Sequence, residues 1–552
     1  MLKKYIHIVL LLCILILSFR IRYVAPLSLA DLKPWPDALE YSLSAYNLYH
    51  HHIYGIKLFG QYYPSHYPYG YPLLIIPFYV IFGSQPYNAV YCSLFFALLS
   101  IVFAYMIGKE LGNRFTGIIA ALFVALCPSH AGFSKHILTE TSSVFFTLLI
   151  CWLLLRVIAT YSKKQILLLL ILGLVTGFSV SVHLTNCLII PPVLISLLLV
   201  RKSNYWSVLK RETIIIFGII LALIPLFLYQ LHTFGSPLKT GYQLWQPELY
   251  GKFKCFSFKF LIHPPPHPQN VWERGNFQVY LFALAGLEKN FYPPYMIPLL
   301  LAGSLLILSK RRKQSKQMEF LIFSSILVTS LFVFFSFYFY QDSRLLLPGV
   351  PLLMILAAYG ITISINKEIF KSLTKQSILS FTMLSLFLMI LIQLTYCNYL
   401  HIKSLPWIVN SEYKLMQDIT SHISDNAIII SEFNPMIAEH YLAENKKIVN
   451  ITISPSSPPF SPYSLKIIKG YLKPIKYDIK KKYRFLLSPK GALNPRTYNF
   501  IRKSLKEGVP VYLVYLPDNP VSKRLFPRIK RYFSRIRQEG DKRLFRLYLK
   551  DW

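Results

Sequence analysis

The feature that most constrains this chain is a series of apolar runs, each close to the length of a membrane-spanning helix. A bilayer core about 30 Å thick requires about 20 apolar residues for each helical span. Only 15% of the 552 residues are charged. The runs therefore predict an α-helical polytopic membrane protein with about eleven transmembrane helices. They cover residues 5–19, 88–107, 117–127, 141–158, 166–182, 187–200, 214–229, 295–308, 320–339, 345–365 and 378–397.

A further apolar segment, residues 71–82, is too short for a span and contains Pro72 and Pro77. We interpret it as an interfacial or re-entrant helix. This assignment matters because an additional span here would reverse the orientation of every later segment. Asp37 would then lie across the bilayer from Glu140 and Arg344.

The basic residues indicate the orientation of the chain. With a cytoplasmic N-terminus, the short cytoplasmic segments hold clusters of Lys and Arg, as in residues 109–114, 201–211 and 310–316. The short turns on the other side hold almost none apart from Lys135 and Arg344. The positive-inside rule therefore favours a multi-pass protein of the cytoplasmic membrane.

Two long segments on the outer side, residues 20–87 and 232–294, are rich in Tyr, Trp, Phe and Pro. Long loops are usually functional or disordered, and aromatic content argues against disorder. We therefore predict a transmembrane domain over residues 1–400 in which these two loops carry function.

Residues 401–552 have a different pattern, in which short apolar strands alternate with helical segments. This alternation predicts a small, soluble, extracytoplasmic α/β domain. The expected strands are 427–431, 448–453, 483–488 and 511–516, and the expected helices are 435–445 and 496–507.

The formal net charge of +35 follows in large part from membrane orientation. We therefore expect membrane lipids, and no nucleic acid, as partners of the basic surface. The chain contains neither a Gly-x-Gly-x-x-Gly sequence nor a Walker sequence, so no nucleotide cofactor is expected.

Several acidic residues of the membrane half fall on the outer side. Asp37 and Glu40 begin an amphipathic helix after the first span, and Glu140 begins the fourth span. Ionisable groups at membrane depth indicate function, although an acid at a helix N-terminus also stabilises the helix dipole. Arg344, on a short outer turn, offers donors that suit a phosphate, or it forms a surface pair with Asp342.

These elements, in this order and topology, resemble the GT-C glycosyltransferases. The closest likeness is to the polyprenyl-phosphate-sugar-dependent branch, which includes protein O-mannosyltransferases and aminoarabinose–lipid A transferases. The resemblance covers about residues 1–400. It is carried by Pro36-Asp37-x-x-Glu40-Tyr41-x-x-x-Ala45, Tyr67-Pro68-Tyr69-Gly70-Tyr71-Pro72-Leu73, Phe82-Gly83, His136-x-x-Thr139-Glu140, Phe234-Gly235-Ser236-Pro237 and Arg344-Leu345-x-Leu347-Pro348.

The resemblance implies an inverting hexosyl- or pentosyltransferase. Its donor would be a polyprenyl-phosphate-linked sugar, and its acceptor a lipid, glycan or protein on the outer face of the membrane. Asp37 matches the family's general base, and Arg344 matches an arginine that contacts phosphate. Glu140 matches a second acidic region in which some members bind a divalent metal ion. The further candidates for substrate or phosphate binding are Lys135, His136, His183 and Tyr67.

The sequence departs from the family at two of these positions. Many relatives have adjacent acids in the first motif, whereas here Ala38 follows Asp37 and the second acid is Glu40. Residues three apart share one helix face, so the sequence leaves open which carboxylate is the base. His183 stands where relatives often have arginine, and it is either a substrate contact or a hydrogen-bonded core residue.

Two other functions are considered. A transporter or flippase predicts charged groups in the middle of the membrane and broken, repeated helices. A glycan ligase or polymerase of another fold predicts basic residues, rather than an early carboxylate, in the outer loops. The acids of this chain gather at the outer ends of its spans, which favours the glycosyltransferase.

Overall fold

A computed structural model describes residues 2–23, 37–58, 61–160, 164–200, 205–245, 247–265, 273–288, 291–293, 296–309, 315–365, 385, 388–396, 419–431, 435–438, 440, 449–452, 494–514, 535–538 and 544–548.

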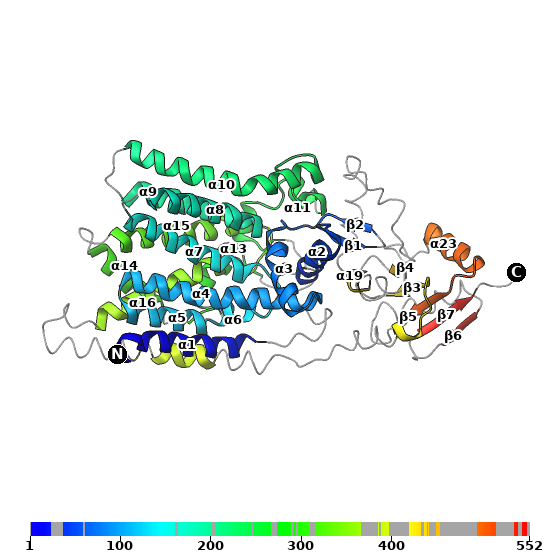
Figure 1. Ribbon diagram of the computed structural model, residues 1–552, viewed down its shortest axis with the longest axis horizontal. Helices are drawn as coiled ribbons and strands as arrows, with labels where there is room; N and C mark the ends of the chain where they lie inside the picture. Colours follow the sequence, from blue (N-terminus) through cyan, green and yellow to red (C-terminus); the bar gives the residue numbers. More distant parts are fainter. Residues whose placement is uncertain are drawn as a thin grey trace.

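Long apolar helices lie side by side and form a bundle (Figure 1). Within the described residues, seven helices are long and apolar enough to cross a membrane, and four shorter apolar helices accompany them. The polytopic membrane fold predicted from the sequence is thereby confirmed. The main helices are α1 (Leu2–Arg22), α4 (Val90–Leu111), α5 (Arg114–Leu126), α7 (Glu140–Ala159), α8 (Lys164–Val182), α9 (Ile190–Val200), α10 (Tyr205–Phe234), α14 (Met296–Ser309), α15 (Ser315–Ser336) and α16 (Val350–Ile365).

Each of the first ten predicted spans coincides with one of these helices. The eleventh, residues 378–397, lies in large part outside the described residues, which include 388–396 as a helix.

Close helix packing depends on glycines at two contacts. A Cβ atom added to Gly173 or Gly177 of α8 would lie within 2.5 Å of a backbone oxygen of α10, and Gly218 of α10 faces Gly173. Gly303 of α14 and Gly360 of α16 approach each other in the same way. Small residues allow membrane helices to approach closely, which increases their van der Waals contact.

Shorter elements connect the long helices. Figure 1 shows α2, α3, β1, β2 and α11 at the end of the bundle nearer the C-terminal sheet, which we call the α2 end. The connecting elements are α2 (Asp37–His51), β1 (Ile56–Leu58), β2 (Gln61–Tyr63), α3 (Gly70–Phe82), η2 (Pro86–Ala89), α6 (Pro128–Phe133), η3 (Leu184–Ile189), α11 (Gly241–Trp245), η4 (Pro247–Gly251), α12 (Lys259–Ile262), α13 (Asn276–Leu284) and η5 (Ser343–Gly349).

The C-terminal region contains a five-stranded sheet of order β4-β3-β5-β7-β6. Strand β3 is parallel to β4 and β5, whereas β7 is antiparallel to β5 and β6. The described elements are β3 (Ile428–Ser431), α19 (Pro435–Ala438), β4 (Val449–Thr452), α23 (Pro495–Lys506), β5 (Val511–Val514), β6 (Arg535–Gln538) and β7 (Leu544–Tyr548).

This arrangement confirms the small α/β fold predicted from the sequence, although β6 and β7 were not predicted. The expected strand at 483–488 and the domain boundary near residue 400 lie outside the described residues. The C-terminal region contacts the α2 end, because α19 packs on α2 and β1 and the rings of Tyr46 and His440 lie 4.9 Å apart.

Candidate active site

Three acidic residues stand at helix starts on the α2 end. Asp37 is the first residue of α2, and Glu140 is the first residue of α7. Asp342 immediately precedes η5 and accepts a hydrogen bond from the backbone N–H of Arg344 at 3.0 Å. A carboxylate is favoured at a helix N-terminus by the helix dipole. Local structure alone therefore stabilises each acid at its position.

Arg344 brings these three acids together from distant parts of the chain. Its Nη2 lies 3.4 Å from Asp37 Oδ2, and its Nε lies 3.4 Å from Glu140 Oε1 and 3.0 Å from Asp342 Oδ2. The Arg344 side chain is only 12% exposed. We call Arg344 with Asp37, Glu140 and Asp342 the arginine–carboxylate cluster.

The cluster also fixes the position of α3. Asp37 precedes α3 in the chain and Glu140 follows it, yet both contact Arg344. Because α4 and α5 form an antiparallel pair between α3 and Glu140, α3 must begin and end on the α2 end. The structure thus agrees with the interpretation of this segment as a helix that does not span.

Tyr67 holds the carboxylate of Asp37 from the side opposite Arg344. Its hydroxyl donates a hydrogen bond of 2.7 Å to Asp37 Oδ1, and its ring stacks on Tyr41 with centroids 4.3 Å apart. Burial and the charge of Asp37 raise the pKa of Tyr67 well above its ordinary value. The Tyr67 hydroxyl therefore stays protonated and orients Asp37; its predicted contact with substrate remains a prediction.

Glu40 lies outside the cluster and anchors the loop that carries Tyr67. The buried Glu40 carboxylate accepts hydrogen bonds from Ser65 Oγ at 2.6 Å and from the His66 backbone N–H, and His66 Nδ1 lies 2.8 Å away. Burial alone would raise the pKa of Glu40, but His66 and these hydrogen bonds lower it overall. Of the two candidate bases, Asp37 alone faces the other acids and Arg344.

Two supporting residues were not singled out by the sequence. Glu288 Oε1 accepts a hydrogen bond from Ser343 Oγ at 2.7 Å, next to Arg344 in the chain. The Tyr340 ring lies 5.7 Å from the Arg344 guanidinium carbon, and its hydroxyl donates to Asp342 at 3.4 Å. Neither residue belongs to a sequence motif. The only signals in the sequence are that Glu288 is an acid on the outer side and that Tyr340 lies in an aromatic-rich segment.

The other candidate residues lie near the cluster without joining its ion pairs. Burial and the charge of Arg344 lower the pKa of His183 to about 4, so its ring is neutral at pH 7. Lys135 is buried in the turn after α6, and His136, half-buried, follows it. The binding roles of these three residues remain predictions.

The role of Glu140 as a metal ligand remains a prediction. Among the residues that the structure describes, no group of three or more His, Cys, Asp or Glu side chains could hold a metal ion. Glu140, the sequence candidate for a metal ligand, is instead paired with Arg344. The guanidinium takes the central position among the carboxylates, where a cation would otherwise lie.

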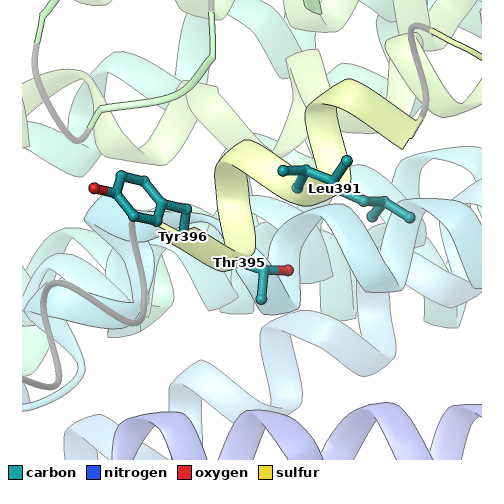
Figure 2. A pocket seen from close by; sticks show the side chains of 4 residues that line it. Leu391, Thr395 and Tyr396 are labelled. Atoms are coloured by element: carbon teal, nitrogen blue, oxygen red, sulfur yellow. The ribbon is translucent and has the colours of Figure 1, made fainter.

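An apolar cavity of about 500 Å³ lies elsewhere, beside the helix at residues 388–396 (Figure 2). It is lined by Leu391, Ile392, Thr395 and Tyr396, and no residue of the arginine–carboxylate cluster is among them. The chemistry of the chain therefore has to be sought at the cluster and not in this cavity.

Comparisons with known proteins give a family match and a set of similar folds. Residues 66–229 match the model of a family described as dolichyl-phosphate-mannose-protein mannosyltransferase. This segment contains Tyr67, Lys135 and Glu140, whereas Asp37 and Arg344 lie outside it. No curated protein sequence matches the chain.

The similar structures extend over nearly the whole chain. ArnT from Cupriavidus metallidurans bound to undecaprenyl phosphate has a TM-score of 0.60 at 10% identity, covering 99% of this chain and 97% of ArnT. The apo form of the same protein gives 0.58 at 12% identity, with 99% and 98% covered. The archaeal oligosaccharyltransferase AglB from Archaeoglobus fulgidus, in complex with an inhibitory peptide and a dolichol-phosphate, gives 0.54 at 13% identity, with 97% and 73% covered.

Proposed function

We propose that this chain, which has the fold of the GT-C glycosyltransferases, transfers a sugar from a polyprenyl-phosphate donor to a lipid, glycan or protein acceptor. The family match at residues 66–229 and the likeness to an ArnT bound to undecaprenyl phosphate support this function. The observation that carries it is the arginine–carboxylate cluster, because it places Asp37 among polar groups at the end of a membrane bundle.

The reaction would take place on the outer face of the cytoplasmic membrane. The clusters of Lys and Arg lie at the opposite end of the bundle from Asp37, for example at Lys109 and Arg156. The positive-inside rule assigns that basic end to the cytoplasm, so the N-terminus is cytoplasmic and the C-terminal sheet is extracytoplasmic.

Asp37 acts as general base in the transfer step. Its carboxylate takes the proton of an acceptor hydroxyl while the acceptor oxygen bonds to the anomeric carbon of the sugar. The bond from that carbon to the phosphate oxygen breaks, and its electron pair leaves on the polyprenyl phosphate. Tyr67 and Arg344 hold one carboxylate oxygen each, which fixes the direction in which Asp37 faces.

Glu140 can contact the substrate from within the same cluster. Its Oε1 faces Arg344, whereas its buried Oε2 has no hydrogen-bond partner among the described residues. A buried carboxylate oxygen without a donor is unfavourable. Glu140 Oε2 is therefore available to accept a hydrogen bond from a hydroxyl of the donor sugar or the acceptor.

Sugar transfer in membranes tests the proposal. Membranes that contain the chain, and matched membranes that lack it, receive a panel of radiolabelled polyprenyl-phosphate sugars. With one donor of the panel, label moves from the polyprenyl fraction into a lipid, glycan or protein fraction in the first sample alone. Label that stays in the polyprenyl fraction for every donor contradicts the proposed function.

Replacing Tyr67 with Phe is expected to lower kcat about tenfold and to leave KM for the donor nearly unchanged, since the ring stays and only a hydrogen bond to a charged group is lost. The measurement is the initial rate of sugar transfer at several donor concentrations. Tyr69→Phe, in the same loop, serves as control, because the structure shows no hydrogen bond from the Tyr69 hydroxyl within the described residues. Equal rates for the two variants would show that the Tyr67 hydroxyl does not orient Asp37.

Removal of divalent metal ions is expected to leave the rate of transfer unchanged within about twofold, because Arg344 supplies the positive charge among the carboxylates. Purified protein is treated with EDTA, passed through a desalting column and assayed with and without added Mg²⁺ or Mn²⁺. A rate that falls on chelation and returns with a metal ion would contradict this prediction.

A further inference from the structure

A second group of buried basic side chains lies at the corner where α1, α5 and α6 meet on the α2 end. Arg22 is the last residue of α1, His130 lies on α6, and Lys135 follows α6. Their exposed fractions are 1%, 0% and 7%. Buried Lys and Arg are unusual in proteins unless they are paired with an acceptor.

Arg22 has a structural role that accounts for most of its donors. Its Nη1 donates to Ser18 Oγ at 2.7 Å and to the Ala125 carbonyl at 2.6 Å, and its Nη2 donates to the Val124 carbonyl at 3.1 Å. These carbonyls end α5, where the helix dipole is negative and a cation is favoured. Arg22 therefore joins the ends of α1 and α5.

Three further donors at this corner have no acceptor within the described part of the chain. Arg22 Nη2 lies 3.0 Å from His130 Nδ1, and because arginine is always protonated, Nδ1 must accept and Nε2 must carry the hydrogen. His130 Nε2, Lys135 Nζ and Arg22 Nε are all buried without a hydrogen-bond partner among the described residues. A single ligand with several acceptor oxygens would satisfy these three donors, since buried donors are normally hydrogen-bonded.

The charge on Lys135 has no acidic partner within the part of the chain that the structure describes. Burial and the positive charge of Arg22 lower the pKa of Lys135 to about 8. The amine is still protonated at pH 7. A buried cation is stable only with a counter-ion, so the corner is suited to an anion.

The corner borders the arginine–carboxylate cluster. Helix α6 contacts α7, which begins with Glu140, and η5, which carries Arg344. Arg344 already faces three carboxylates within 3.4 Å, so the region around it is net negative and disfavours a further anion. Lys135 is thus the better partner for the phosphate group of a donor whose sugar lies at the cluster.

We propose that Lys135, together with the N–H groups of His130 and Arg22, binds the phosphate group of the polyprenyl phosphate carrier. The inference rests on the proposed function and assigns to this corner the phosphate contact that the family resemblance places at Arg344. Phosphate oxygens accept several hydrogen bonds at once, and charge-assisted bonds of this kind are strong. The lipid tail then extends away from the cluster into the bilayer.

The test measures binding of sugar-free polyprenyl phosphate to the purified chain in nanodiscs, so no transfer activity is required. Lys135→Met is expected to raise the Kd at least tenfold, because a charged hydrogen bond is lost. Without lipid, the same variant is expected to melt at an equal or higher temperature, because an unpaired buried charge is replaced by an apolar side chain of similar length. Lys239→Met, at an exposed site, is the control.

Competing ligands identify the source of the phosphate. Polyprenyl phosphate is expected to remain bound in an excess of phosphatidylglycerol and of inorganic phosphate. Displacement by either competitor at equal concentration would overturn the assignment to the carrier lipid. A Lys135→Met variant that binds polyprenyl phosphate as tightly as the unmodified chain would overturn the site itself, whether or not the chain transfers sugar.

Discussion

Replacing Asp37 with Asn lowers the rate of sugar transfer roughly 100- to 10,000-fold, the range expected when a general base is lost. The amide keeps the size of the carboxylate and can still accept the hydrogen bond from Tyr67, but it cannot take a proton from the acceptor hydroxyl. The initial rate in membranes that contain equal amounts of each protein is the measurement. The Kd for polyprenyl phosphate is expected to change little.

Glu273→Gln provides the matched control, because Glu273 is an exposed acid just before α13. It loses one negative charge without touching the cluster, so its rate should equal that of the unmodified chain. Normal activity of the Asp37→Asn variant at normal expression would remove Asp37 from the role of base.

Replacing Arg344 with Gln is expected to destabilise the chain by about 3–5 kcal/mol, the range found when one partner of a buried ion pair is removed. Three carboxylates would then lie close together without a cation, and Asp37 would lose the contact that orients its Oδ2. Sugar transfer should be lost together with stability. The measurements are the Tm of the detergent-purified protein and the yield of folded protein.

Replacing Glu140 with Gln in the Arg344→Gln variant separates the loss of stability from the loss of sugar transfer. If repulsion among the carboxylates causes the loss of stability, the double variant should recover part of the Tm while transfer stays low. Arg20→Gln, at an exposed arginine in the last turn of α1, should leave both quantities nearly unchanged. An Arg344→Gln protein with unchanged Tm would show that the cluster does not contribute to stability.

Much of the membrane fold follows from the sequence, because lipid forces each apolar run into a helix. The segment at α3 illustrates the part that length alone leaves open. Its thirteen residues include an internal Pro77, which supports a short helix, but only the ion pairs between Arg344 and both Asp37 and Glu140 establish on which end it lies. Strands β6 and β7 escaped prediction because they are only four and five residues long and charged residues interrupt them, so neither forms an apolar run.

The candidate site was predictable where a residue stands at a helix start and not where its role depends on a distant partner. Asp37, Glu140 and Arg344 all mark element starts that the sequence shows. Glu40 shares the helix face of Asp37. Its carboxylate, however, is bound by Ser65 and His66, which lie 25 and 26 residues later in the chain. A tertiary contact of this kind leaves no periodic pattern, so spacing alone cannot separate the base from the anchor.

A glycosyltransferase breaks the bond between sugar and phosphate, and this cleavage can be measured directly. Purified protein in proteoliposomes receives a polyprenyl-phosphate sugar and a membrane extract as the source of acceptors. Mass spectrometry then measures free polyprenyl phosphate and glycosylated acceptor. The proposed transfer releases one polyprenyl phosphate for each sugar transferred, and almost none is expected with Asp37→Asn. A donor that crosses the bilayer with its sugar still attached, at the same rate in both proteins, would contradict it and would indicate a flippase.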